Sequence, residues 1–311
     1  MTAEAQIDDP LARAAREIRA RPGFLLRQVQ QHLSSFIGPG LSALEATLPQ
    51  AEALGVIRRM PGTDQSHLAR MAGVDQATAG VVVEALERRG LIVRKIDDDR
   101  RRRTLFAEPA GDALMHEALR VVLPANARLL NALDRDEAAS VVRGLRALSR
   151  HDSSRAPAWS PSAPGSLPLF DQPSFLIRRA LQIAAALFHE EAAGFGLTAA
   201  QYAMLARIAA FAAPDQASFL QKFAAPRSSV VPLVRALESR GYVRRLPGAE
   251  DGRKRALALE PAGRALLRDI HPAVTRSEVR LLAPLDHVQA HALVRGLAAI
   301  AQAQDPALPT P

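Results

Sequence analysis

ALERRGLIVRKIDDDRRRR, residues 85–103, decides the fold, because it places the end of a helix, a strand and an arginine-rich turn in direct succession. Gly90 stands just past the helical segment, where glycine readily adopts the left-handed conformation that ends a helix. The chain repeats this pattern as ALESRGYVRRLPGAEDGRKR at residues 236–255. One polypeptide therefore carries the same basic hairpin twice.

The repeat extends far beyond the hairpin. PGFLLRQ (22–28) aligns with PSFLIRR (173–179) at an offset of 151 residues. One extra residue in the arginine-rich turn changes the offset to 152, which aligns EPAG at 108–111 with EPAG at 260–263. A register kept over about 125 residues indicates a tandem duplication of one domain.

Composition favours two helical domains. The 311 residues are 48% hydrophobic but only 4% aromatic, so alanine, leucine and valine must form the cores, and the first two favour helices. The net charge of +8 points to a polyanionic partner. There are no cysteines, which excludes disulfides and thiolate metal sites. The sequence has no secretory signal and no stretch of about 20 apolar residues that could span a membrane, so we expect a cytoplasmic protein.

Periodicity and helix breakers predict the same order of elements in both copies. The helices expected in the first copy are 23–37, 49–59, 65–71, 76–89, one starting at Pro109, and 134–148, with strands at 92–95 and 104–107. In the second copy we expect the long helix at 227–240 and strands at 242–246 and 256–259. The predicted domains are 22–150 and 173–304, with an N-terminal extension (1–21, helical at 10–20), a Pro/Ser-rich linker (151–172) and a disordered tail (305–311).

Helix, short helix, turn, long helix and a two-stranded wing form a winged helix-turn-helix. The segments FLIRRALQ, LTAAQYAML, ALESRGYVRR, EDGRKR and EPAG of the second copy resemble the MarR family of transcriptional regulators, as does the matching series in the first copy. Members of that family are typically homodimers with interlocking terminal helices. The resemblance implies a mainly α fold with small β-wings, in which two winged helix-turn-helix domains form a single-chain pseudo-dimer.

Arginines at the wing tips are the first candidates for DNA contact. A short strand pair projects its turn outward, where guanidinium groups reach phosphates or a minor groove. Recurrence in both copies favours DNA contact over a solvated charge run. The candidates are Arg100, Arg101, Arg102, Arg103, Arg253, Lys254 and Arg255. On the family pattern, Arg101 and Arg253 match the arginine that enters the minor groove.

The long helices offer few polar side chains to base edges in the major groove. The candidates are Gln76, Thr78, Arg227, Ser228 and Ser229. Helix capping is the alternative role for the hydroxyl residues among them. Val81 and Pro232 stand where the family often carries arginine, and Pro232 removes one helical hydrogen bond.

Together these features predict a sequence-specific regulator that binds double-stranded DNA. The specific expectation is a ligand-responsive repressor of an imperfect palindrome with two non-identical half-sites. The alternative is a degenerate winged-helix module for protein interaction or ligand sensing with weak or no specific DNA binding, which Val81 and Pro232 would permit.

The resemblance also implies a small aromatic or phenolic effector, held in a crevice between the DNA-binding lobe and the dimerisation helices. The candidate contacts are His32, Phe36, Arg58, Phe188, His189, Tyr202 and Arg207. Core packing of the aromatic residues and surface exposure of the others are the alternative roles. Divergence between the copies argues against two equivalent pockets.

Enzyme motifs are missing from the sequence. It has no G-x-S-x-G, no phosphate-binding glycine loop, no H-E-x-x-H and no cysteine nucleophile, so we expect neither catalysis nor a cofactor. His287 and His291 have the i, i+4 spacing of metal ligands, but only Asp286 stands nearby, and we expect no metal site.

Overall fold

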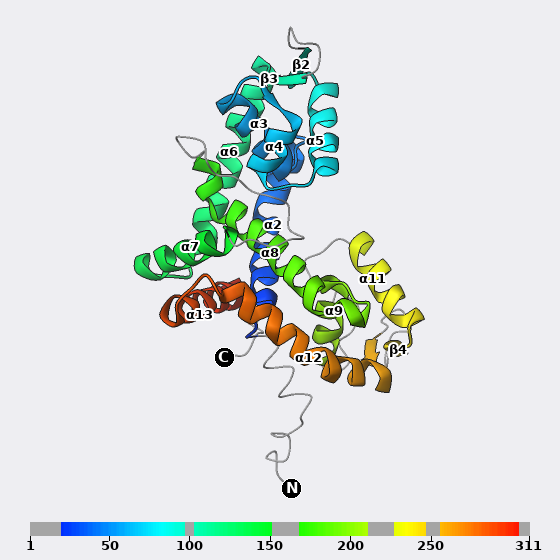
Figure 1. Cartoon of the computed structure of the whole chain (residues 1–311). Helices are drawn as coiled ribbons and strands as arrows, with labels where there is room; N and C mark the ends of the chain where they lie inside the picture. The colour runs from blue at the N-terminus through cyan, green and yellow to red at the C-terminus, as the bar shows by residue number, and fades with distance from the viewer. Residues whose placement is uncertain (1–19, 97–102, 151–167, 211–226, 247–255, 305–311) are drawn as a thin grey trace. The chain divides into compact units, whose positions relative to one another are not determined.

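A computed structural model describes residues 20–96, 103–150, 168–210, 227–246 and 256–304. Figure 1 shows the order of their helices and strands. In the first half these are α2 (Pro22–Ala43), α3 (Leu48–Arg59), β1 (Thr63–Asp64), α4 (Gln65–Ala72), α5 (Gln76–Arg88), β2 (Ile92–Ile96), β3 (Arg103–Ala107), α6 (Pro109–Leu130) and α7 (Arg135–Ser149). In the second half they are η1 (Pro168–Asp171), α8 (Pro173–Glu191), η2 (Ala193–Phe195), α9 (Ala199–Ala210), α11 (Arg227–Ser239), β4 (Val243–Leu246), β5 (Ala256–Leu259), α12 (Pro261–Leu282) and α13 (His287–Gln304).

The chain forms two units of contacting residues. Unit 1 comprises Met1–His32 and Ile183–Pro311, and unit 2 comprises Leu33–Gln182. Both boundaries fall inside a helix, the first in α2 and the second in α8. Unit 1 therefore contains the start of α2 together with α9 to α13, while unit 2 contains the start of α8 together with α3 to α7.

Most expected elements are confirmed to within one or two residues, but the end of the first long helix is wrong. The helix predicted to stop at Ile37 continues through Gly38-Pro39-Gly40 to Ala43. Pro39 lacks an N–H and weakens the helix locally, yet Leu41 beyond it is buried. An added Cβ at Gly40 would lie 2.6 Å from a methyl group of Val121, so this glycine allows α2 to pack closely on α6. The expected helix at 10–20 lies outside the described residues.

Unit 2 holds a helix-turn-helix (α4 and α5) followed by a hairpin, and the described part of unit 1 holds the long helix α11 followed by a hairpin. In unit 2, β2 and β3 pair antiparallel from Ile92↔Ala107 to Ile96↔Arg103, and β1 adds a third strand beside β3. In unit 1, β4 and β5 pair from Val243↔Leu259 to Leu246↔Ala256. Figure 1 shows α4 and α5 beside the β2–β3 hairpin. The two-residue strand β1 was not predicted, because two residues carry no periodic signal.

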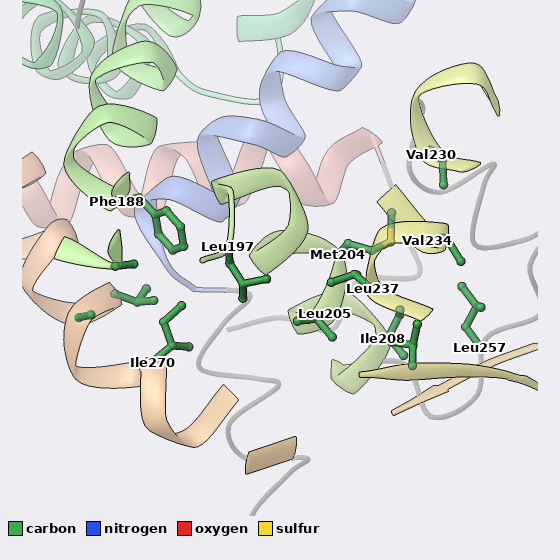
Figure 2. Close-up of a cluster of buried hydrophobic side chains, with 14 residues drawn as sticks. Phe188, Leu197, Met204, Leu205, Ile208, Val230, Val234, Leu237, Leu257 and Ile270 are labelled. Atoms are coloured by element: carbon green, nitrogen blue, oxygen red, sulfur yellow. The ribbon is translucent and has the colours of Figure 1, made fainter. Parts of the chain in front are cut away.

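Apolar residues on one face of each long helix hold it against its unit. Ala79, Val83 and Leu86 of α5 are buried at the i, i+4, i+7 spacing of one helical face. Val230, Val234 and Leu237 of α11 have the same spacing, each 151 residues further along. Figure 2 shows the α11 side chains in a core with Phe188, Leu197, Met204, Leu205, Ile208, Leu257 and Ile270. Burial of this face leaves the opposite face of each helix to contact a partner.

The repeated EPAG motif contains a glycine that packs against backbone. An added Cβ at Gly111 would collide with the carbonyl oxygen of Leu91, and one at Gly263 with the carbonyl oxygen of Tyr242. In the same turns, the Glu108 N–H donates to Leu91 O at 3.0 Å and the Glu260 N–H to Tyr242 O at 2.9 Å. These contacts join the end of the wing region to the start of α6 and of α12.

Gly111→Ala and Gly263→Ala are each expected to lower the free energy of unfolding by about 2 kcal/mol, because backbone cannot move aside as a flexible side chain can. Urea denaturation of the full chain measures this loss. Gly38→Ala is the matched control, since its added Cβ meets nothing within 4 Å. That change is expected to stabilise α2 by about 0.5–1 kcal/mol. Equal stability of all three variants would contradict the assigned role of the motif.

Candidate nucleic-acid interface and ligand site

The start of α5 is capped by its own side chains. Asp75 accepts a hydrogen bond from the Thr78 N–H at 2.7 Å, and the Thr78 hydroxyl donates to Asp75 at 2.8 Å. These bonds lower the pKa of Asp75 below its usual value. Asp75 is thus the capping residue, and Thr78 takes part in the first-turn hydrogen bonding that was its alternative to DNA contact. Gln76 is exposed at the same end, where a base edge could be read.

Val81 is a large apolar residue of α5 that is 68% exposed. It lies two turns into the helix, on the face opposite the buried stripe. In α11, Pro232 lies inside the helix five residues after its start. Arg227, Ser228 and Ser229 form the first turn of α11, and their side chains lie outside the described residues.

An ion pair joins each wing to the end of its long helix. The Arg94 guanidinium of β2 lies 2.9 Å from the Glu87 carboxylate of α5. The corresponding residues of unit 1, Arg245 of β4 and Glu238 of α11, are 3.3 Å apart. Sequence reasoning missed both pairs, although their recurrence at an offset of 151 was a usable signal. They fix the direction of each hairpin relative to its helix.

Arginines at the helix ends are also matched between the units. The Arg89 guanidinium after α5 donates to the carbonyls of Glu45 and Leu44. The Arg240 guanidinium after α11 donates to the carbonyl of Gly196 at 2.7 Å. These basic side chains support the fold and are not candidates for DNA contact.

Of the wing candidates, only Arg103 lies within the described residues. It is the first residue of β3, is exposed, and pairs with Ile96 across the hairpin. Arg100, Arg101, Arg102, Arg253, Lys254 and Arg255 lie outside the described residues. Within the stem of the unit 2 hairpin, Lys95 packs over the Phe106 ring at 4.8 Å.

Three of the ligand candidates meet in unit 1. The Phe188 and Tyr202 rings lie 5.4 Å apart, and Arg207 lies 5.6 Å from the ring centroid of Phe24. Phe24 and Ala206 are buried with Tyr202 packed against them. Burial raises the pKa of Tyr202 to about 12. His189 is exposed.

The candidates from the first copy do not form a comparable group. His32 belongs to unit 1 and is half-buried. In unit 2, Phe36 packs under Arg128 of α6 at 4.1 Å. Arg58 is 45% exposed and contacts Asp112 and His116 near the other end of α6. Since α6 rises 1.5 Å per residue, Phe36 and Arg58 contact it about 18–24 Å apart.

A partly buried polar group in unit 1 acts electrostatically on Tyr202. The Arg21 guanidinium donates to the Glu278 carboxylate of α12 at 2.7 Å and contacts His271 Nδ1 at 3.0 Å. Burial raises the pKa of Glu278 to about 7, although Arg21 acts in the opposite direction. Glu278 therefore exchanges its proton near neutral pH.

Stability should depend on pH through Glu278. Its pKa is about 7 in the folded chain and near its ordinary value of about 4.3 in the unfolded chain, so the folded state holds the extra proton between those values. Stability is therefore lost as pH rises from about 5 to 7.5. The thermal midpoint should fall about 3–5 °C further in the wild type than in Glu278→Gln. Parallel profiles for the two proteins would contradict this assignment.

A second buried ion pair ties α8 to the helix-turn-helix of unit 2. Arg178 of α8 lies 2.7 Å from the carboxylate of Glu52, whose side chain is only 1% exposed. The same guanidinium donates to the carbonyl of Ala72, the last residue of α4, at 2.8 Å. Nearby, Ser174 of α8 exchanges two hydrogen bonds with Asn126 of α6. The start of α8 is thus locked to α3, α4 and α6.

Neither a metal cluster nor a membrane span was found in the described part of the chain. No group of three or more histidine, cysteine, aspartate or glutamate side chains there could hold a metal ion. None of the described helices combines the length and apolar character needed to cross a bilayer. His287 and His291 lie in the first two turns of α13.

Comparison with known proteins shows which chains resemble this one. A MarR family model matches residues 46–103. The HTH-type transcriptional repressor Rv2887 of Mycobacterium tuberculosis is 34% identical over 114 residues, which cover 36% of this chain and 81% of that protein. A probable transcriptional regulator from Pseudomonas aeruginosa is 35% identical in its crystal structure, covering 42% of this chain and 96% of that one with a TM-score of 0.38. The repressor CouR, solved on a 23-mer DNA duplex, is 30% identical, with coverages of 45% and 99% and a TM-score of 0.41.

Proposed function

The chain belongs to the MarR family of transcriptional regulators, and on that basis we propose that it is a ligand-responsive repressor that binds double-stranded DNA as a single-chain pseudo-dimer. The two predicted domains, 22–150 and 173–304, would each present one recognition helix and one wing. Residues 151–172 would link them. Membership of a family of transcriptional regulators supports the expectation of a regulator rather than an enzyme.

Recurrence of the same contacts in both units supports a tandem duplication of one domain. The Glu87–Arg94 and Glu238–Arg245 ion pairs, and the EPAG glycines packed on backbone, are found at offsets of 151 and 152 residues. Helices α3 and α9, and likewise α5 and α11, begin and end at corresponding residues. Two copies of one fold account for these coincidences more simply than independent packing does.

The segments that make up each unit support pairing of the two copies within one chain. In unit 1, Phe24 at the start of α2 packs on Ala206 of α9. In unit 2, Arg178 near the start of α8 pairs with Glu52 of α3. Each unit therefore includes the start of the opening helix of the other copy. Such an exchange of helices is expected when dimerisation helices interlock. The linker makes this pairing intramolecular.

Sedimentation of the chain, with and without a DNA duplex from the promoter beside its own gene, tests the proposal. One chain per duplex is expected, because one chain would supply both recognition helices and both wings. Two chains per duplex would show that the copies pair between chains. No shift of a duplex from the promoter beside its own gene, together with no retention on heparin, would refute the DNA-binding function itself.

The operator should be an imperfect palindrome with unequal halves. The residues at corresponding positions of α5 and α11 differ, since α11 has Arg227 and Pro232 where α5 has Gln76 and Val81. Different side chains at equivalent positions read different base edges. Selection of sites from a random pool is expected to recover two related but distinct half-sites, and a perfect inverted repeat would contradict this prediction.

Exposed Val81 favours a second candidate function. An apolar side chain that is 68% exposed on a recognition helix suits a protein partner better than a phosphate or a base edge. A winged-helix module that holds a protein or ligand without reading DNA is the alternative. The heparin and gel-shift measurements separate it from the repressor.

A further inference from the structure

Apolar side chains stand at the same exposed position of both long helices. Val81 of α5 is 68% exposed, on the face opposite the buried stripe. Pro232, which corresponds to it at the repeat offset of 151 residues, is exposed on α11. One turn further along, the exposed residues differ in charge, since Glu84 of α5 corresponds to Arg235 of α11. Apolar character is therefore what the two helices share at this position.

The side chains that precede Val81 on α5 leave it open to a partner. One turn earlier, Ala77 is exposed and has only a methyl group, and Gly80 has no side chain. The Thr78 hydroxyl already donates its proton to Asp75. A surface that approaches this face of α5 would therefore meet the Val81 side chain directly.

Thymine is the exception among the bases, because its major-groove edge suits an apolar side chain. Guanine, cytosine and adenine present only hydrogen-bond donors and acceptors there, whereas thymine presents its C5 methyl group beside one acceptor. An exposed valine or proline gains free energy by burying that methyl group. A protein partner would need a larger apolar surface, and the other large exposed apolar side chains of the described residues lie on other elements. They are Ile96 of β2, Leu123 of α6, Val279 of α12 and Val288 of α13.

We propose that Val81 and Pro232 each contact the C5 methyl group of a thymine, at the same position in the two otherwise different half-sites of the operator. The inference rests on the proposed function, because it names a base that the repressor reads. Two copies of one fold would place corresponding residues over corresponding base pairs. The shared thymine then follows from the shared apolar character, while differences such as Glu84 and Arg235 make the rest of the half-sites unequal.

Replacement of thymine by deoxyuridine tests the proposal, because deoxyuridine lacks only the C5 methyl group. The probe is the duplex that the full chain selects from a random pool, with each thymine replaced in turn. At one shared position in each half-site, the replacement is expected to weaken binding about fourfold, which is the value of one buried methyl group. Gel-shift titration measures the change.

Serine variants assign each thymine to its side chain, because serine is shorter and polar. In Val81→Ser, deoxyuridine should have almost no effect at the shared thymine of one half-site and should still cost about fourfold at that of the other. Pro232→Ser should give the reverse pattern. Both residues are exposed, so both variants are expected to fold. Val279→Ser is the matched control, since Val279 of α12 is 65% exposed and should leave both thymine effects unchanged.

Val81→Arg should change the preferred base instead of abolishing binding. Arginine donates to both acceptors of guanine, so selection with this variant is expected to recover guanine in place of the shared thymine in one half-site. The thymine of the other half-site should remain, because Pro232 is unchanged. A change in both half-sites, or in neither, would contradict the assignment.

Selected half-sites that share no thymine, equal binding of the thymine and deoxyuridine duplexes, or thymine effects that survive both serine variants would each overturn the inference. The outcome is distinguishable from that of the proposed function. A chain that selects a duplex but does not distinguish thymine from deoxyuridine would refute the thymine contacts and leave the repressor standing. A chain that selects no duplex and is not retained on heparin would refute both, and Val81 would then be assigned to a protein interface.

Discussion

Replacing Arg178 by methionine is expected to lower the free energy of unfolding of the full chain by about 3–5 kcal/mol in urea denaturation. The change leaves the Glu52 carboxyl, which is 1% exposed, without the one cationic partner that it has among the described residues. It also frees the carbonyl of Ala72, to which Arg178 donates at 2.8 Å. Methionine keeps most of the apolar volume, so the loss reports charge and hydrogen bonding rather than a cavity.

The loss in Arg178→Met should be larger at pH 8 than at pH 5. Burial raises the pKa of Glu52, and Arg178 opposes that effect. Without the arginine the pKa rises further, so the folded chain holds a proton that the unfolded chain has released. Stability of the variant therefore falls as pH rises above the ordinary glutamate value. A loss that is independent of pH would point to packing instead of charge.

Two further variants distinguish loss of the ion pair from general destabilisation of the chain. Arg178→Met combined with Glu52→Gln removes the buried charge and is expected to recover about half of the lost stability. Arg120→Met removes an arginine that is 79% exposed and should cost less than about 0.5 kcal/mol. If Arg178→Met were no worse than Arg120→Met, α8 would not be locked to unit 2 through this pair.

Local patterns predicted most of the fold but not the contacts between distant segments. The helix-turn-helix and the hairpins follow from apolar spacing, capping residues and Gly90, all of which act within a few residues. The end of α2 was missed because Gly38-Pro39-Gly40 has the sequence of a helix stop, and only its packing on Val121 shows why the helix continues. A tertiary contact of this kind leaves no local signal.

The candidate sites likewise divide into those that a sequence pattern predicted and those that depend on contacts between distant segments. Duplication pointed to the wings because the basic cluster recurs, but Glu52 has the sequence context of an ordinary surface residue on an amphipathic helix. Its partner Arg178 is 126 residues away, and no spacing rule connects them. The pairing of Glu52 with Arg178 becomes visible only in the structure.

Neutralising both wing tips, as Arg101→Ala with Arg253→Ala, is expected to weaken duplex binding about 100-fold at physiological salt. Each arginine would contribute about tenfold, in keeping with the 1–3 kcal/mol of a good arginine contact to DNA. The slope of log K against log salt should become shallower by about 0.9 for each phosphate that is no longer neutralised. A gel-shift titration at several salt concentrations measures both quantities.

The single variants decide how the two hairpins are used. If one chain grips one duplex with both wings, Arg101→Ala and Arg253→Ala should each cost about tenfold, and their free energies should add, because the two sites share no contacts. If only one copy reads DNA, one variant should carry the whole effect and the other none. Arg120→Ala controls for the change in net charge, and a loss of affinity as large as that of either wing variant would show that overall charge, not the wings, attracts the duplex.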